Sequence, residues 1–350
     1  MRLFIAITGL LSGAYFALRL PFPFNIPLFL FAAVGGYCVL LRKTRKILLR
    51  YCFLTWTREE ICRHILITGD TGCGKTTSGF HNILFQLTQN DPDWGGLVLG
   101  VKGDEPAYIN ELFEHHHRKK DVIEVRVRPS DASTKWKAPH RYNLLSDRSI
   151  PWMTHAKIIV DIADSMTSGQ PHAFFRPMAQ FALANAFELI DAHGLPVTLT
   201  RAYQLLTSRE LASRYIKPFS KKTASEKQQE LARFFKSTFT EAQAFEQREA
   251  VEGTIKTYLG FFLNPDVAEV FCSDQPNTFS LAEINKGAVI TLGMPQSLAT
   301  ERRYIQTYLK ILFYIQALRR LDKPKDQRQH ENLLLLVGDE FQDLITSSED

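Results

Sequence analysis

The chain has 350 residues, of which 45% are hydrophobic and 23% are charged, and this composition excludes an intrinsically disordered protein. Its length predicts two or three folded units. The formal net charge of +5 permits a nucleic-acid partner but does not by itself indicate one. The five cysteines include no C-x-x-C pair, which argues against both a disulfide framework and a zinc site.

Two apolar segments occupy the first fifty residues. They run from Leu3 to Leu18 and from Leu28 to Leu41, and five basic residues follow between Arg42 and Arg50. Each segment is short for a hydrocarbon core of about 30 Å, but flanking residues can lengthen it at the interface. We expect a transmembrane helical hairpin over residues 1–50, with the remainder of the chain in the cytoplasm by the positive-inside rule. The alternative is a signal peptide.

A glycine-rich loop follows. The segment GDTGCGKT, Gly69–Thr76, fits G-x-x-x-x-G-K-[ST] at every fixed position. Residues 64–68 (HILIT) predict a short buried strand before the loop, and residues 76–89 can start a helix after it. Backbone N–H groups in such a loop bind phosphate oxygens at a helix N-terminus. The alternative is a glycine-rich turn that binds nothing.

In the functional interpretation, Lys75 is catalytic because its ammonium bridges the β- and γ-phosphates, and the Thr76 hydroxyl ligates magnesium. The residues assigned to nucleotide binding are Gly69, Asp70, Thr71, Gly72, Cys73, Gly74, Lys75, Thr76 and Thr77.

Strand and helix patterns alternate beyond the loop. The predicted elements are strands at residues 97–99, 121–129 and 287–295, helices across residues 151–263, and an amphipathic helix at residues 301–321. A polar loop then leads to a last strand. This order predicts an α/β fold: a RecA-like P-loop NTPase core with a mostly parallel sheet and a helical insertion. We divide the chain into an anchor (1–50), a first part of the core (51–150), an all-helical insertion (151–265) and a return to the core (266–350).

The last strand ends in two acids. The aliphatic run Leu333–Val337 predicts a central parallel strand buried on both faces, with Asp339 and Glu340 at its carboxyl end, where α/β sheets place ligands. Asp339 is the predicted magnesium ligand and Glu340 the predicted catalytic base that polarises water. An aliphatic run ending in Asp-Glu is by itself commonly structural, and the glycine loop is what favours function. The chain lacks an N-K-x-D guanine-binding motif, which favours ATP over GTP, and lacks an LSGGQ segment, which argues against the ABC class.

Together these features resemble the type IV secretion system coupling proteins, the TraG/TraD class of conjugation ATPases within the FtsK/HerA-like P-loop superfamily. The resemblance depends on an expected N-terminal two-helix membrane anchor, the glycine loop, the helical insertion and three short motifs, which are "KGDE" at residues 102–105, "YNLL" at residues 142–145 and "GDEFQDL" at residues 338–344. Gly100 and Val101 depart from the acid and proline usual in the family, and Asn-Leu-Leu replaces Asn-Pro-Leu. The chain also stops ten residues after Glu340, where the family's core continues, so we expect a fragment or a truncated product.

The resemblance implies a membrane-anchored ATP hydrolase that uses ATP and Mg²⁺ to drive the transfer of DNA, or of relaxase-bound DNA. It implies a homo-hexamer, secretion-channel proteins as partners, and a multi-pass location in the bacterial inner membrane. A neighbouring subunit would supply an arginine, and the candidates are Arg302, Arg303, Arg319 and Arg320. The alternatives are a P-loop ATPase for protein export or pilus assembly, and a nucleotide-binding adaptor that docks substrates.

Three further clusters carry weaker signals. The segment Arg214–Lys236 is rich in Lys, Arg and aromatic residues, which suits either a face that binds nucleic acid or a solvated helix with core aromatics. The run "HHHRKK", residues 115–120, predicts an exposed helix end. Lys102 and Asp104 either line the nucleotide cleft or simply end a strand.

Overall fold

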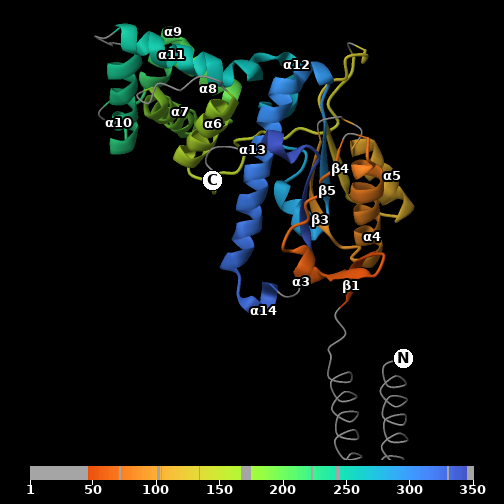
Figure 1. The fold of residues 1–350 in the computed structure, drawn as a ribbon. Coiled ribbons are helices and arrows are strands. Elements are labelled where there is room, and N and C mark those ends of the chain that lie inside the picture. The colour runs from red at the N-terminus through yellow and green to blue at the C-terminus, as the bar shows by residue number, and fades with distance from the viewer. Residues whose placement is uncertain are drawn as a thin grey trace, which may run out of the picture. The chain divides into compact units, whose positions relative to one another are not determined.

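The computed structural model describes residues 46–70, 72–100, 103, 105–133, 135–166, 175–221, 224–240, 245–328 and 331–344 (Figure 1). The chain divides into two compact units, residues 1–90 and residues 91–350.

The described part of the first unit is a small hairpin with a helix packed on it. Strands β1 (Ile47–Tyr51) and β2 (Leu54–Thr57) pair antiparallel, and the short helix α3 (Arg58–Ile61) follows. After the glycine loop, a π-helical segment η1 (Lys75–His81) runs into helix α4 (Asn82–Asn90). The amide of Gln86 bonds both backbone groups of Arg50 at 2.8 and 3.0 Å, and this clamps α4 to β1.

The second unit contains a four-stranded sheet in the order β4-β5-β3-β6, in which all neighbours are parallel. The strands are β3 (Gly95–Leu99), β4 (Val122–Arg126), β5 (Val289–Gly293) and β6 (Leu334–Gly338). All of β3 is buried and β4 alternates between buried and more exposed residues, as expected for an inner and an outer strand. The parallel sheet agrees with the predicted α/β class.

Strand β6 lies at one edge of this sheet in the described part of the chain. It pairs with β3 from Leu334 to Gly338, and all five of its residues are only half-buried. The prediction of a central strand buried on both faces is therefore wrong. An aliphatic run predicts the strand itself, but burial also depends on neighbours that the run does not specify.

Helices cover both faces of the sheet. Helix α5 (Glu105–His115) lies on the face opposite the long helix α13 (Ala299–Leu318) (Figure 1). The connecting elements are η2 (Lys119–Asp121), η5 (Leu281–Lys286), η6 (Gln296–Leu298), η7 (Arg319–Asp322), α14 (Lys325–Arg328) and η8 (Phe341–Leu344). The loop predicted before the last strand thus contains one short helix, α14.

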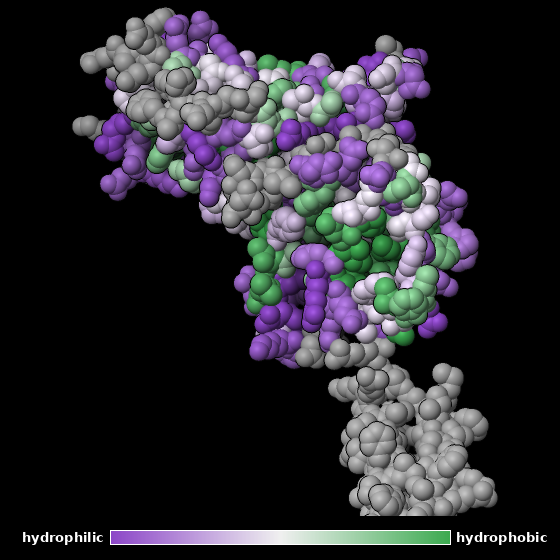
Figure 2. Space-filling view, in the orientation of Figure 1, coloured by the Kyte–Doolittle hydropathy of each residue, from purple (hydrophilic) through white to green (hydrophobic). Residues whose placement is uncertain are grey.

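Between β4 and β5 the chain is helical, as the sequence pattern predicts. The elements are α6 (Trp152–Met166), α7 (Phe175–Ala192), α8 (Leu199–Thr207), α9 (Arg209–Ile216), α10 (Glu226–Phe235), η3 (Lys236–Thr240), α11 (Phe245–Leu259), η4 (Gly260–Leu263) and α12 (Pro265–Phe271). Side-chain oxygens of Thr198, Ser208, Ser225 and Asn264 accept hydrogen bonds from the first turns of four of these helices. Hydrophilic residues predominate on the surface of this region around α9–α11 (Figure 2).

Among the residues that the structure describes, no helix is long and apolar enough to span a bilayer. This finding corrects the prediction of a multi-pass protein of the inner membrane, which we withdraw. The apolar segments at residues 3–18 and 28–41, on which the predicted hairpin rests, lie outside the described residues.

Candidate nucleotide site

The glycine loop has the backbone geometry of an anion cradle. Gly72 and Gly74 have φ angles of 82° and 86°, in the left-handed region that glycine adopts without strain. The first helical bond runs from Ser78 N to Gly74 O at 2.8 Å, so the helix begins directly behind the loop. Its first N–H groups have no partner inside the helix and carry the positive end of the helix dipole.

The Lys75 side chain folds back over this loop. Its Nζ donates to Gly69 O at 2.5 Å and to Asp70 O at 3.1 Å. The ammonium and the N–H groups behind it therefore belong to one short segment, and this donor set fits the phosphates of a nucleotide. Thr76 follows in the first helical turn, where it is half-buried, and Thr77 is exposed. Thr71 lies outside the described residues.

The segment before the loop differs from the prediction. Residues 64–68 do not form a strand, and Leu66 is 85% exposed. A strand needs a neighbour to satisfy its backbone groups, and no strand pairs with this segment within the described residues. The helix predicted after the loop is confirmed by η1 and α4.

The acidic pair forms a turn at the carboxyl end of β6. Asp339 N donates to Leu99 O at 3.0 Å, which extends the β3–β6 pairing by one residue. Glu340 has a φ of 54°, a left-handed conformation that is uncommon for residues other than glycine. Both residues are half-buried. Both residues therefore lie at the carboxyl ends of the strands, where parallel α/β folds bind ligands.

No cluster of three or more His, Cys, Asp or Glu side chains that could hold a metal ion occurs in the described part of the chain. Mg²⁺ does not require such a cluster, because it is commonly held by one or two protein ligands together with phosphate oxygens and water. The two predicted ligands, Thr76 and Asp339, belong to different units of the chain, and their joint role stays a prediction.

A third carboxylate also lies at the carboxyl ends of the strands. It was not singled out from the sequence. Glu105, at the start of α5, is 6% exposed, and its Oε2 accepts a hydrogen bond from Gly103 N at 3.0 Å. It is the last residue of "KGDE". The other two side chains considered in that motif, Lys102 and Asp104, lie outside the described residues.

Helix α13 also brings polar groups to the carboxyl ends of β3 and β6. Gln306 Nε2 donates to Gly100 O at 2.7 Å, one residue past β3, and Lys310 Nζ donates to Leu344 O, just after β6. Arg302, four residues before Gln306, donates to Gln296 Oε1 at 3.1 Å. All three are buried. The spacing of four residues among apolar neighbours is a signal that could have revealed this polar stripe from the sequence.

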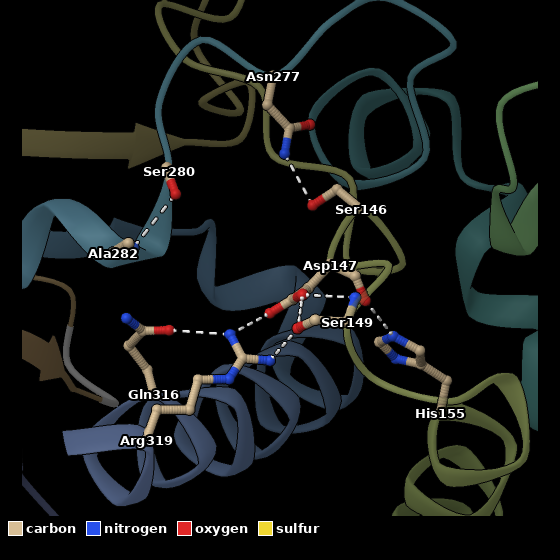
Figure 3. A network of polar contacts seen from close by, with 9 residues as sticks. All are labelled: Ser146, Asp147, Ser149, His155, Asn277, Ser280, Ala282, Gln316 and Arg319. Carbon is tan, nitrogen blue, oxygen red and sulfur yellow. Dashed lines mark hydrogen bonds and ion pairs between the residues drawn. The ribbon is translucent and has the colours of Figure 1, made fainter. Parts of the chain in front are cut away.

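Of the arginines considered for the neighbouring subunit's site, Arg302, Arg319 and Arg320 have the following partners inside the chain. Arg319 binds the Asp147 carboxylate at 2.8 Å and the Ser149 hydroxyl (Figure 3). Arg320 binds Glu331 at 3.1 Å and Asn332 O at 2.7 Å, and Arg302 binds Gln296 as described above. These contacts give each of the three a structural role within its own subunit.

The predicted exposed helix end at residues 115–120 is only partly correct. His115 and His117 are exposed, but Arg118 turns inward. Its guanidinium donates to Gly287 O at 2.5 Å and to Asp121 Oδ2 at 2.8 Å, and it lies over the Phe113 ring. Arg118 thus ties the end of α5 to the turn before β5.

The structure supports the structural interpretation of the segment Arg214–Lys236, and nucleic-acid binding by this segment stays a prediction. Phe219 and Phe235 are buried in the helical core, as the structural alternative predicts. The exposed cations are Arg214, Lys217, Lys221, Lys227, Arg233 and Lys236. A groove of about 480 Å³ on this surface is lined by Glu230, Arg233, Phe234, Lys236 and Ser237.

Comparison with solved structures places the fold among conjugative coupling proteins. The unbound form of the bacterial conjugative coupling protein TrwB, as TrwBdeltaN70, is similar with a TM-score of 0.50 at 14% identity, covering 83% of this chain and 59% of that chain. The plasmid coupling protein TrwB in complex with the non-hydrolysable GTP analogue GDPNP is similar with a TM-score of 0.50 at 14% identity, covering 83% of this chain and 60% of that chain.

The resemblance to coupling proteins is thus confirmed at the level of the fold. The chain spans less than two thirds of the length of the TrwB chains that it matches. No family model matches the sequence, and no curated protein matches it.

Proposed function

We propose that this protein is a nucleotide-hydrolysing motor of conjugation that couples ATP hydrolysis to the transfer of DNA or relaxase-bound DNA. The observation that carries the proposal is the pair of acids at the carboxyl end of β6 in a fold that is similar to TrwB. A phosphate-binding loop with its lysine over the backbone supports the same assignment. TrwB has been solved with a GTP analogue, so the nucleotide itself is part of the test.

In this proposal, Lys75 and the N–H groups of Gly69–Thr77 bind the phosphates of ATP. Thr76 and Asp339 hold Mg²⁺, which when bound neutralises charge on the phosphates. Glu340 orients and polarises the attacking water. The left-handed backbone of Glu340 supports a functional role, because strained conformations of this kind concentrate at active sites.

The exposed cations of Arg214–Lys236 are the proposed contact for DNA. Arg233 and Lys236 flank the half-buried Phe234 in the groove described above, which supports a surface that binds backbone phosphates and stacks a base. Binding of this kind weakens steeply as salt is raised, because it depends on released counterions.

The decisive experiment measures ATP and GTP hydrolysis by the purified chain with and without single-stranded or duplex DNA. We expect hydrolysis in the presence of Mg²⁺, faster with DNA, and reduced by roughly 100-fold or more in Glu340→Gln. Hydrolysis that persists in Glu340→Gln would come from a contaminant or another site and would contradict the assignment. A rate that does not respond to any DNA would favour an ATPase for protein transfer.

Assembly into a homo-hexamer, with a relaxase and secretion-channel proteins as partners, completes the proposal. The fold similarity to a conjugative coupling protein is its support. Mass photometry with and without ATP and DNA tests it, and a chain that stays monomeric under all these conditions argues against a ring.

A further inference from the structure

The side chain of Lys310 joins α13 to the turn that carries the acidic pair. This lysine is completely buried, with 0% of its surface exposed. Its Nζ donates to the carbonyl of Leu344, and it lies 5.5 Å from the centre of the Phe341 ring. The ammonium thus contacts both ends of η8, the short helix that starts directly after Glu340.

A fully buried ammonium is costly unless hydrogen bonds and charge partners compensate it. Leucine or methionine at position 310 would fill the same space without that cost. Packing alone therefore does not explain a lysine at this position. What its contacts do is fix the chain segment that leaves the acidic pair.

Two further contacts show that this segment is held from both sides. Asp339 N bonds to Leu99 O at 3.0 Å, which fixes the start of the turn to β3. Gln306, one helical turn before Lys310, bonds to Gly100 O at 2.7 Å, which fixes α13 to the exit of the same strand. Glu340 lies between the β3 contact and the Lys310 contact, in a left-handed conformation that needs such support.

We propose that Lys310 is a positioning residue that fixes the backbone turn carrying Asp339 and Glu340. This inference rests on the proposed function only for the consequence that a loosened turn slows hydrolysis. The attachment of the turn to Lys310 does not depend on the proposed function, and hydrogen exchange tests it without any measurement of hydrolysis.

The first measurement is hydrogen exchange of the full-length protein followed by mass spectrometry. Lys310→Met removes the ammonium and keeps an unbranched side chain of similar length. We expect amides of residues 339–344 to exchange roughly fivefold to tenfold faster, the effect of losing one hydrogen bond, while β3 and β5 are unchanged.

The matched control is Thr307→Val on the same helix. Thr307 is also buried, but its hydroxyl donates to the carbonyl of Arg303 within α13 and does not reach the turn. It should leave residues 339–344 as they are in the unchanged protein. Equal exchange in Lys310→Met and Thr307→Val, or an increase spread over the whole second unit, overturns the proposal.

If Lys310→Met does not fold, Phe341→Leu replaces it in the same test. Phe341 is 37% exposed, so a smaller side chain is tolerated there while the ring next to the ammonium is lost. We expect faster exchange confined to residues 339–344. Unchanged exchange in a folded Phe341→Leu is the contrary result.

The second measurement separates positioning from stability. For Lys310→Met we expect kcat for ATP to fall about tenfold while the KM and the affinity for a fluorescent ATP analogue change less than about twofold. An unchanged kcat with faster exchange would overturn the positioning role. If the parent protein hydrolyses no nucleotide, the proposed function fails, and the exchange data still decide whether Lys310 holds the turn.

Discussion

The two segments proposed to act on the nucleotide are held in different ways. The glycine loop is fixed by its own neighbours: Lys75 bonds to Gly69 and Asp70, and Ser78 bonds to Gly74. The turn after β6 is fixed by residues far away in the sequence. Its partners are Leu99 on β3 and Lys310 on α13.

Because of this difference, we expect the two segments to respond differently when other parts of the chain move. A loop held by local bonds can keep its shape when distant parts of the chain move. A turn held by a helix and a strand moves with them, so the position of Glu340 depends on α13.

The largest effects on nucleotide binding and hydrolysis are expected for Lys75→Ala and Glu340→Gln. Lys75→Ala removes a cation that contacts the phosphates in both ground and transition states, so we expect nucleotide affinity to fall by roughly 100-fold, along with hydrolysis. Glu340→Gln keeps the shape of the side chain and removes its charge, so binding should persist while hydrolysis is lost. A fluorescent ATP analogue measures the first effect and phosphate release the second. Loss of binding in both variants would contradict the division of roles.

The pairing of β3 with β6 can be broken at Gly96. A Cβ built there would lie 2.1 Å from Leu335 O on β6, a backbone atom that cannot move away alone. We expect Gly96→Ala to lower the free energy of unfolding by roughly 2–3 kcal/mol, measured by urea denaturation.

Gly253 on α11 is the control for that measurement, because no described residue outside the backbone of its own helix lies within 4 Å of a Cβ built there. Gly253→Ala should raise the free energy of unfolding by about 0.5–1 kcal/mol through helix propensity. If Gly96→Ala is as stable as the parent protein, β3 and β6 are not packed as described.

Much of this architecture could be predicted from the sequence, and two of the failures share a cause. The loop motif, the strand at Leu334–Gly338 and the helices between β4 and β5 are all local patterns, and each is present. The exposure of Leu66 and the edge position of β6 depend on which strands become neighbours, and no local pattern specifies that. Lys310 was missed for a different reason: its spacing of four residues from Gln306 was a usable local signal, but a lysine in an amphipathic helix is normally assigned to the solvent face.

A polar network that includes a buried histidine contacts the middle of α13 at Tyr308 and its C-terminal end at Arg319. His155 bonds through Nδ1 to Tyr308 Oη at 2.7 Å, and its Nε2 lies 3.2 Å from Asp147 O. Burial lowers the pKa of His155 below the usual 6.5. The unfolded chain therefore takes up a proton near pH 6.5 that the folded chain does not, so stability is present above this pH and declines as pH falls below it.

We expect the free energy of unfolding of the parent protein to decrease between pH 7 and pH 5 because of this residue. His155→Gln cannot titrate, and its urea-denaturation midpoint should depend less on pH over the same range. Identical pH dependence in the two proteins would show that His155 is accessible to protons in the folded state.

The smallest effect concerns Arg319, whose contacts with Asp147 and Ser149 are partly exposed to solvent (Figure 3). Exposed ion pairs contribute little, so Arg319→Met should lower the free energy of unfolding by about 1 kcal/mol or less. Arg320→Met is the matched comparison, because the Arg320–Glu331 pair is more buried and Arg320, two residues after the end of α13, also donates to the carbonyl of Asn332. We expect it to cost more, about 2 kcal/mol, since the half-buried Glu331 carboxylate then keeps Lys323 but loses Arg320.

The rate of ATP hydrolysis is a sharper test of the role of Arg319 than the free energy of unfolding. An arginine that completes a neighbouring subunit's site is worth roughly 1,000-fold or more in kcat. Arg319 already has partners in its own chain, so Arg319→Met should change kcat by less than about threefold. A 1,000-fold loss without loss of stability would mean that Arg319 leaves Asp147 to act on a neighbour. In that case the contact in Figure 3 would be one of two states, and the end of α13 would be a moving part and not a fixed support.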